Sequence, residues 1–214
     1  MFRSLFKKKA PELLPEVAGL TIGRDVSIDP IEMKLLSSDT LFVAPETGFS
    51  IVAQGKCDLG EQSFLHRFYL DDDRYILQIQ GGDGVADTRI DEIVLWYAYD
   101  VQYVSDDGAW TNALRRSKSP RFDLQTEAEP ISYDRVWFAH SDADEDLMTY
   151  WEDVHDTRVS QDPSRIFQSA MLFGRGLQSG TDEMLLVNLE EPADGERSVS
   201  FLIGLALPQH VLIT

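Results

Sequence analysis

Hydrophobic and polar residues alternate along much of the chain, which is typical of strands that bury one face. The clearest run covers residues 93–104. Its odd-numbered positions are apolar or aromatic, whereas its even-numbered positions begin apolar, as at Trp96, and become polar, as at Asp100 and Gln102. This pattern predicts a long strand that runs from the core of a sheet to its edge.

Runs with the same period predict eight more strands, and residues 19–28 have room for one short strand besides. The eight runs are residues 41–43, 49–53, 63–70, 75–80, 131–138, 169–177, 184–189 and 199–207. Asp71, Asp72 and Asp73 fall between two runs that form a hairpin. They are interpreted as its solvated tip rather than as a metal cluster, because adjacent side chains of a strand point apart.

Helix signals are fewer and shorter. The sequence Asp29-Pro30-Ile31-Glu32 combines a capping residue, a proline at the first helical position and an early acid, and it predicts a helix over about 30–36. Residues 105–130 are polar, with a turn near their start, and are expected to be irregular.

The acidic stretch at residues 142–157 predicts a second helix. Ser141 can cap it, acids fill its first turn where the helix dipole favours them, and apolar residues recur at helical spacing from Leu147 to Val154. Arg158 stands at the C-terminal end, where a cation is favoured. One arrangement thus explains the carboxylates, the apolar stripe and the terminal charge together.

The alternative for this stretch is a divalent-metal site. Three aspartates have the i, i+2, i+4 spacing of the first ligands of an EF-hand, but Leu147 stands where that loop needs glycine. The residues of a looser site would be His140, Asp142, Asp144 and Asp146. The helix is preferred, because a metal site explains only the carboxylates.

Short strands joined by tight acidic turns favour antiparallel sheets over βαβ units. The expected fold class is α+β, mostly antiparallel β-sheet with two or three short helices. Residues 1–18 are expected to be a basic, flexible tail and linker, followed by a single acidic β-rich domain over 19–214.

Charge excludes some functions. The chain has 37 acidic and 19 basic residues, so its formal net charge is −18. The first ten residues carry +4, which leaves −22 on the rest. A nucleic-acid-binding domain would need a basic footprint, so no nucleic-acid partner is expected. A single cysteine excludes an intramolecular disulfide framework and a cysteine-rich zinc site.

The basic N-terminus has two interpretations. Its apolar residues share one side of a helical turn and could contact a membrane surface together with the basic ones: Phe2, Arg3, Leu5, Phe6, Lys7, Lys8 and Lys9. A frayed terminus is preferred, because three apolar residues are a weak wedge and anionic lipid would repel the acidic body. With no export signal and no apolar run of membrane-spanning length, the expected location is the cytoplasm, with peripheral contact to the inner membrane as the alternative.

Isolated candidates carry little chemistry. Cys57 ends a predicted strand without a basic neighbour beyond Lys56 and is expected to be inert. His66, on an apolar strand face, is interpreted as a hydrogen-bonded, partly buried histidine. Trp110 is predicted to be an exposed contact residue. It lies near a basic patch that supplies two further candidate binding residues, Arg115 and Arg116.

Three segments together resemble a known family: His66 to Tyr75, Tyr133 to Trp137, and the closing hairpin over 184–207. The chain resembles the YjfK-like proteins, an uncharacterised bacterial family, over about residues 19–214. The family has no established activity, so no residue role transfers. Because its genes often lie near one for a phage-shock-protein-A-like protein, the resemblance implies an accessory role in envelope stress or membrane maintenance, with that protein as a partner.

Two functions remain open from the sequence. The preferred one is a non-enzymatic interaction protein, without a cofactor, whose acidic body is attracted to a partner with a basic surface. The alternative is a divalent-metal-dependent enzyme with its carboxylates near Asp142–Asp146.

Overall fold

The computed structural model describes residues 13–29, 33, 36–46, 48–83, 89–159, 162–193 and 195–213. In these residues the chain forms twelve strands, the α-helix α2 (Asp107–Ser117) and the short 3-10 helix η1 (Gln209–Val211). The strands are β1 (Asp25–Ile28), β2 (Phe49–Asp58), β3 (Phe64–Leu70), β4 (Tyr75–Gly81), β5 (Ile90–Tyr103), β6 (Arg121–Leu124), β7 (Ile131–Arg135), β8 (Met148–His155), β9 (Ser164–Gly176), β10 (Asp182–Pro192), β11 (Ser198–Ala206) and β12 (Leu212–Ile213).

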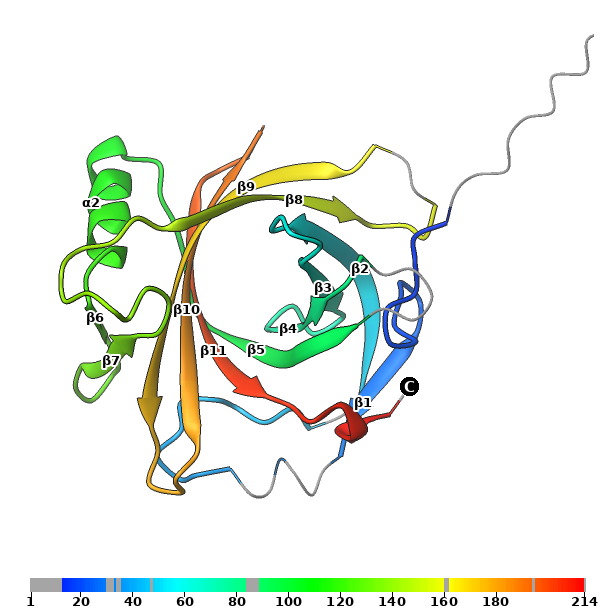
Figure 1. Cartoon of the computed structure of the whole chain (residues 1–214), viewed down its shortest axis with the longest axis horizontal. Helices are drawn as coiled ribbons and strands as arrows, with labels where there is room; N and C mark the ends of the chain where they lie inside the picture. The colour runs from blue at the N-terminus through cyan, green and yellow to red at the C-terminus, as the bar shows by residue number, and fades with distance from the viewer. Residues whose placement is uncertain are drawn as a thin grey trace, which may run out of the picture.

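Eight of these strands close into an antiparallel barrel (Figure 1). Strands β2 to β5 pair in chain order, and so do β8 to β11. The two meanders join along both edges, because β5 pairs with β11 and β2 pairs with β8. Closure gives every barrel strand a neighbour on each side and removes the exposed edges of an open sheet.

The predicted α+β class with two or three helices is therefore wrong. Sheet dominance and antiparallel pairing were predicted, but the described residues form a closed barrel with α2 as its one sizeable helix. Most of the predicted helix over 30–36 lies outside the described residues. Met33 and Leu36, which are described, pack against the core.

The predicted helix over 142–157 is a second error. Residues 148–155 are strand β8, which pairs with β2 and β9. Met148, Tyr150 and Glu152 face into the barrel, while Trp151 faces out and packs against Phe167 with ring centroids 5.1 Å apart. A buried acid at an inward position hid the alternation, because an acid on a strand is normally read as solvent-facing.

A helix occurs instead in the segment expected to be irregular. Asp106 caps α2 by accepting a 2.7 Å hydrogen bond from the Ala109 amide, and Arg115 and Arg116 lie in its last turn. These are ordinary helix signals. They were outweighed by Gly108 and by the few apolar positions of a helix that buries only a narrow stripe.

Two apolar clusters lie on opposite faces of the barrel wall. The inner one is small: Cys57, Leu65, Val94, Trp96, Tyr150, Ala170, Leu186 and Leu202. The outer one is larger and alternates with it along the strands, so that Ile93 and Leu95 face out where Val94 and Trp96 face in. The predicted two-faced pattern of the strand over 93–104 is confirmed.

Two structures cover the outer cluster. α2, β6 and β7 lie against one side of the barrel, beside β9 and β10, and the N-terminal segment lies on the opposite side, beside β2 (Figure 1). Leu14 and Val17, placed by the sequence in a linker, are buried there. The predicted strand over 41–43 is absent, since these described residues cross the outer face without a ladder and set Phe42 against Tyr75 and Tyr97.

One carboxylate fastens this crossing segment to the barrel. Glu183 of β10 accepts hydrogen bonds from the Leu41 amide (2.7 Å), the Tyr133 hydroxyl (2.6 Å), Arg175 Nε (2.7 Å) and the Thr40 hydroxyl. It is 1% exposed. Segments far apart in the sequence therefore share a single buried charge.

We expect Glu183→Ala to lower the free energy of unfolding by about 3–5 kcal/mol, because it leaves the half-buried Arg175 and three other donors without their buried acceptor. Urea denaturation followed by tryptophan fluorescence measures the change. Asp182→Ala, at the exposed neighbouring position, is the control and should change stability by less than about 0.5 kcal/mol. Equal losses in the two variants would contradict this role for Glu183.

Candidate functional site

A buried ion pair lies inside the barrel. Arg67 of β3 reaches across β2 to Glu152 of β8, with 2.8 Å between Nη1 and Oε2, and the two side chains are 3% and 0% exposed. Arg67 also donates to the Tyr150 hydroxyl (2.8 Å) and to Gln78 Oε1 (3.2 Å), and the Tyr69 hydroxyl donates to Glu152 Oε1 (2.8 Å). These bonds replace the water that both charges lose on burial.

Glycine makes room for this pair. Gly55 lies on β2, between the two strands that carry the charges, and pairs with Arg67 in the ladder. A Cβ at Gly55 would come within 2.0 Å of Glu152 Oε1. Any side chain at Gly55 would therefore displace the carboxylate from its position above β2.

The polar chain continues across the barrel interior. Gln168 donates to Glu152 (2.8 Å), Asn188 donates to both Gln168 (2.6 Å) and Glu190 (2.9 Å), and Ser198 donates to Glu190 (3.2 Å). These residues come from four successive strands, β8 to β11. The network thus ties the second meander together at the level of the ion pair.

Burial and the neighbouring Glu152 raise the pKa of Glu190 above its usual value of 4.5. The side-chain oxygen of Asn188 is buried and has no hydrogen-bond partner among the described residues. A proton on Glu190 would reduce the negative charge in the interior to the single carboxylate that Arg67 balances.

Next to this network lies a cavity of about 100 Å³. Its wall is mostly apolar, with an arginine and two glutamine side chains among the polar groups. The lining residues are Leu59, Leu65, Arg67, Gln78, Gln80, Glu92, Trp96, Trp137, Met148, Tyr150, Leu172, Met184 and Leu186. The barrel interior is therefore filled with hydrogen-bonded polar side chains at one level, and at the next it contains this mostly apolar cavity, which we call the hollow level.

The cavity adjoins a surface groove of about 530 Å³, and both are lined by Glu92, Leu172 and Met184. The loop after β7 lies at this junction. Val136 donates to the Leu172 carbonyl (2.8 Å), and the next residue, Trp137, lines the cavity and packs against both apolar clusters. Trp137 thus separates the barrel interior from the exposed loop that follows.

Arg135 holds that loop in place. Its guanidinium donates to the carbonyl oxygens of Lys118 (3.0 Å), Ala143 (2.9 Å), Ser141 (2.5 Å) and Phe138 (3.4 Å). The side chain is 6% exposed. The acidic loop is therefore organised by a buried cation beneath it and carries its own carboxylates on the outside.

Cys57 is buried, in agreement with its predicted inertness, and His66 is hydrogen-bonded as predicted but fully rather than partly buried. Burial raises the pKa of the Cys57 thiol to about 12, so the thiolate is not available as a nucleophile near neutral pH. His66 is fully buried and its Nε2 lies 2.8 Å from the Gly82 carbonyl oxygen. Burial lowers the pKa of His66 and favours the neutral ring.

The residues of the alternative metal site do not come together. Asp146 forms an ion pair with Lys118 at 2.7 Å. Across the described residues, no three histidine, cysteine, aspartate or glutamate side chains gather closely enough to hold a metal ion. His140, Asp142 and Asp144 are exposed along the loop.

Trp110 is not the exposed contact residue that was predicted. It is 5% exposed, packs into the outer cluster and lies beneath the Arg197 guanidinium, 5.2 Å from the ring centroid. Its polar sequence neighbours belong to the exposed side of α2, which misled the prediction. Arg115 and Arg116 are exposed, the latter above Phe122.

The proposed membrane-contact residues, all within 2–9, lie outside the described residues. No helix in the part of the chain that the structure describes has the length and apolar character needed to cross a membrane.

Sequence reasoning missed the interior polar network. One signal was present, since Arg67 lies between Leu65 and Tyr69 on a strand whose other face was also apolar. A charge at such a position must be paired if both faces are buried. Its partner, Glu152, was hidden inside the segment predicted to be a helix.

Comparisons with known proteins place the chain in a family. The family described as "Protein of unknown function (DUF2491)" matches residues 1–212. The chain belongs to this family. It is also similar to "Uncharacterized protein YjfK" of Escherichia coli (strain K12), with 23% identity over 216 residues that cover 100% of this chain and 95% of that protein. The resemblance to the YjfK-like proteins is thus confirmed, while the implied phage-shock gene neighbourhood stays a prediction.

No solved structure is significantly similar to this one. For this DUF2491 member, the arguments about function therefore rest on its own residues.

We expect Glu152→Ala to lower the free energy of unfolding by about 3–5 kcal/mol, because it leaves the buried guanidinium of Arg67 without its carboxylate partner. The adjacent Asp153 is a matched control, since it pairs with Arg165 at the same 2.8 Å but with side chains 45% and 56% exposed. Asp153→Ala should cost less than about 1 kcal/mol. Guanidinium chloride unfolding of both variants measures the difference, and similar losses would show that burial of the pair is unimportant.

We expect the stability of the protein to depend on pH through Glu190. Its raised pKa means that the folded state binds the proton more tightly, so this contribution is complete below pH 4.5 and is lost as pH rises through the folded pKa. Glu190→Gln should therefore be more stable than the parent at pH 8, and the difference should vanish near pH 4.

Thermal unfolding between pH 4 and pH 8 tests this expectation. Glu191→Gln, at the half-buried next position, is the control, and its Tm should change with pH in the same way as that of the parent. If the Tm of Glu190→Gln also changes with pH in the same way as that of the parent, ionising Glu190 in the folded protein costs no stability.

Proposed function

We propose that this protein is a non-enzymatic interaction protein that presents an acidic outer surface to a partner with a basic one. The proposal is supported chiefly by how the described charges are distributed. Inside the barrel, Arg67 balances Glu152, and Glu190 is a further acid. Most acidic residues lie outside, on loops, turns and exposed strand positions.

The basic side chains do little to offset this excess. Ten of the fourteen described lysine and arginine side chains are already in ion pairs with acids. Arg135 and Lys56 point their charge at backbone carbonyls. The net charge of −18 therefore gives the outer surface a negative potential, which accelerates encounter with basic partners at low ionic strength.

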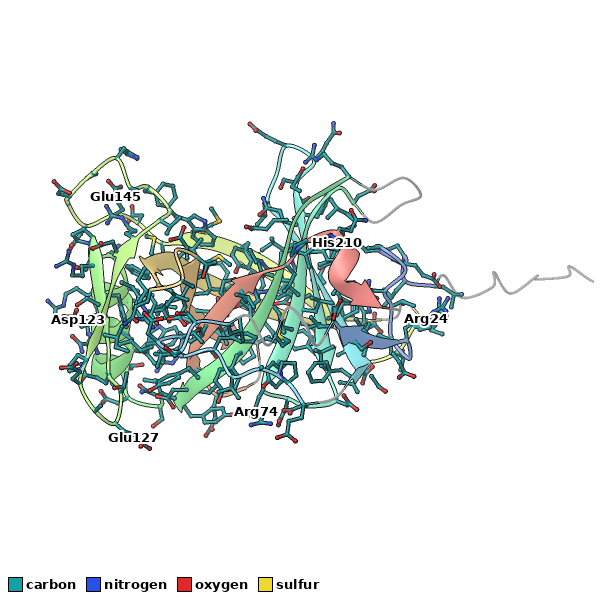
Figure 2. All side chains as sticks on the ribbon, turned by 90° about the horizontal axis from the view of Figure 1, so that it is seen from below. Arg24, Arg74, Asp123, Glu127, Glu145 and His210 are labelled. Atoms are coloured by element: carbon teal, nitrogen blue, oxygen red, sulfur yellow. The ribbon has the colours of Figure 1, made fainter. Side chains whose placement is uncertain are left out.

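One end of the molecule offers such a surface. Asp123, Glu127 and Glu145 are spread over the end formed by β6, β7 and the loop before β8, opposite the end that carries Arg24 (Figure 2). Asp123, Glu127 and Glu129 are exposed. We call these last three residues the acidic end.

The cellular setting is part of the same proposal. We place the protein in the cytoplasm, in an accessory role in envelope stress or membrane maintenance, with a phage-shock-protein-A-like protein as partner. The basic tail would add peripheral contact with anionic lipid. This setting follows from the gene neighbourhood that the family resemblance implies.

We expect the protein to bind a purified phage-shock-protein-A-like protein, with affinity that falls as salt is raised. Asp123→Asn, Glu127→Gln and Glu129→Gln combined should weaken binding at least about fivefold, a loss of about 1 kcal/mol. The control combines Glu61→Gln, Asp73→Asn and Glu196→Gln, which removes the same charge from exposed sites elsewhere. Surface plasmon resonance at two salt concentrations measures both.

Equal weakening by the two triple variants would mean that total charge, not the acidic end, attracts the partner. Absence of binding by the parent protein would refute this choice of partner. A separate experiment tests the tail: sedimentation of the protein with anionic vesicles is compared with and without residues 2–9.

A further inference from the structure

The hollow level of the barrel contains hydrogen-bonding groups without partners. Trp96 lines the cavity, and its Nε1 is buried with no hydrogen-bond partner among the described residues. Gln78 uses its Oε1 to accept from Arg67 Nε, which leaves its NH₂ group for another partner. A buried donor without an acceptor costs about 1–3 kcal/mol, so a site that holds one favours a molecule that supplies an acceptor.

The position of Trp96 is built into the fold. Its strand neighbour is Gly204 of β11, and a Cβ at Gly204 would lie 2.3 Å from the Trp96 ring. The indole therefore packs against the backbone of Gly204, and a larger residue at this position would displace the ring. The placement of Trp96 in the cavity wall thus depends on the glycine opposite it.

Size and wall chemistry restrict what could enter. A volume of about 100 Å³ sets an upper limit of about six heavy atoms, since benzene, which has six, binds in a protein cavity of 150 Å³. Most of the wall is aliphatic, aromatic or thioether, and Leu172, Leu186 and Met184 are typical of it. A compact apolar body therefore fits better than an extended or heavily hydroxylated one.

Charge restricts the ligand further. Arg67 lines the cavity but is already paired with Glu152 at 2.8 Å, so its charge is balanced without an anionic ligand. Glu92 lines both the cavity and the groove outside it, where its carboxylate would repel an incoming anion. A cation would meet Arg67 at the inner end. A neutral molecule avoids both penalties.

We propose that the cavity between Trp137 and Arg67 is a binding site for a small, neutral, mainly apolar molecule with one hydrogen-bond acceptor. The cavity-lining donors that this acceptor can bond to are Trp96 Nε1 and the side-chain NH₂ groups of Gln78 and Gln80. The groove outside is the route of entry, because it shares Glu92, Leu172 and Met184 with the cavity. This site is independent of the acidic end and of its partner.

Three probes of equal size test the ligand class: cyclopentanone, methylcyclopentane and isobutyrate, each with six heavy atoms. Ligand-detected NMR and the shift in Tm measure binding to the full chain. We expect cyclopentanone to bind at least about threefold more tightly than methylcyclopentane, as one net hydrogen bond allows, and isobutyrate to bind least. Equal binding of ketone and hydrocarbon, tighter binding of isobutyrate, or no binding of cyclopentanone would each overturn the proposal.

Variants locate the site. Leu172→Phe should reduce cyclopentanone binding at least tenfold by filling the junction of cavity and groove. Trp96→Phe and Gln80→Leu, which remove donors, should each reduce it about three- to tenfold. Trp110→Phe is the matched control, since it removes an indole N–H from the outer cluster, and should change binding less than twofold. Should Leu172→Phe fail to fold, the milder Gln80→Leu and Trp96→Phe still decide the matter, and unchanged binding in both would place the probe elsewhere.

Discussion

The ion pair between Arg67 and Glu152 is the constraint on which the barrel depends. The two residues lie on strands that flank β2, and β2·β8 is one of the two seams that join the meanders. A charge buried in an apolar wall is tolerated only with a compensating partner, so the seam must close at the register that brings Glu152 to Arg67. Gly55 makes that register sterically accessible, and the hydrogen bonds through Gln168 and Asn188 carry it into the second meander.

The closed wall creates two surfaces that are used differently. Outside, large apolar side chains are covered by the N-terminal segment on one side and by α2, β6 and β7 on the other. Inside, space is limited, and one level is filled with paired polar groups while the next keeps a cavity. Glu183 shows that the outer layer relies on the same principle as the inner one, since one buried carboxylate gathers donors from segments about 140 residues apart.

This separation bears on function. Cys57 and His66 are buried, with the pKa of the thiol raised and that of the ring lowered, whereas most acids are on the outside. The proposed interaction function draws on this acidic outer surface, which the closed barrel supports. The cavity lies near an exposed loop, and Trp137 belongs both to the barrel interior and to the loop that Arg135 organises.

The sequence by itself determined most of the strands, with their two faces, and the excess of acidic residues, because alternation and composition are local properties that do not depend on distant neighbours. The hairpin around Asp71–Asp73 and the long strand over 93–104 were predictable for that reason. Tertiary structure alone decided that the sheet closes, that the segment after Leu147 is a strand, and that Trp110 is buried. Each of these depends on partners distant in the chain: Glu152 looks like a surface acid until Arg67 is beside it, and only the closed barrel places it there.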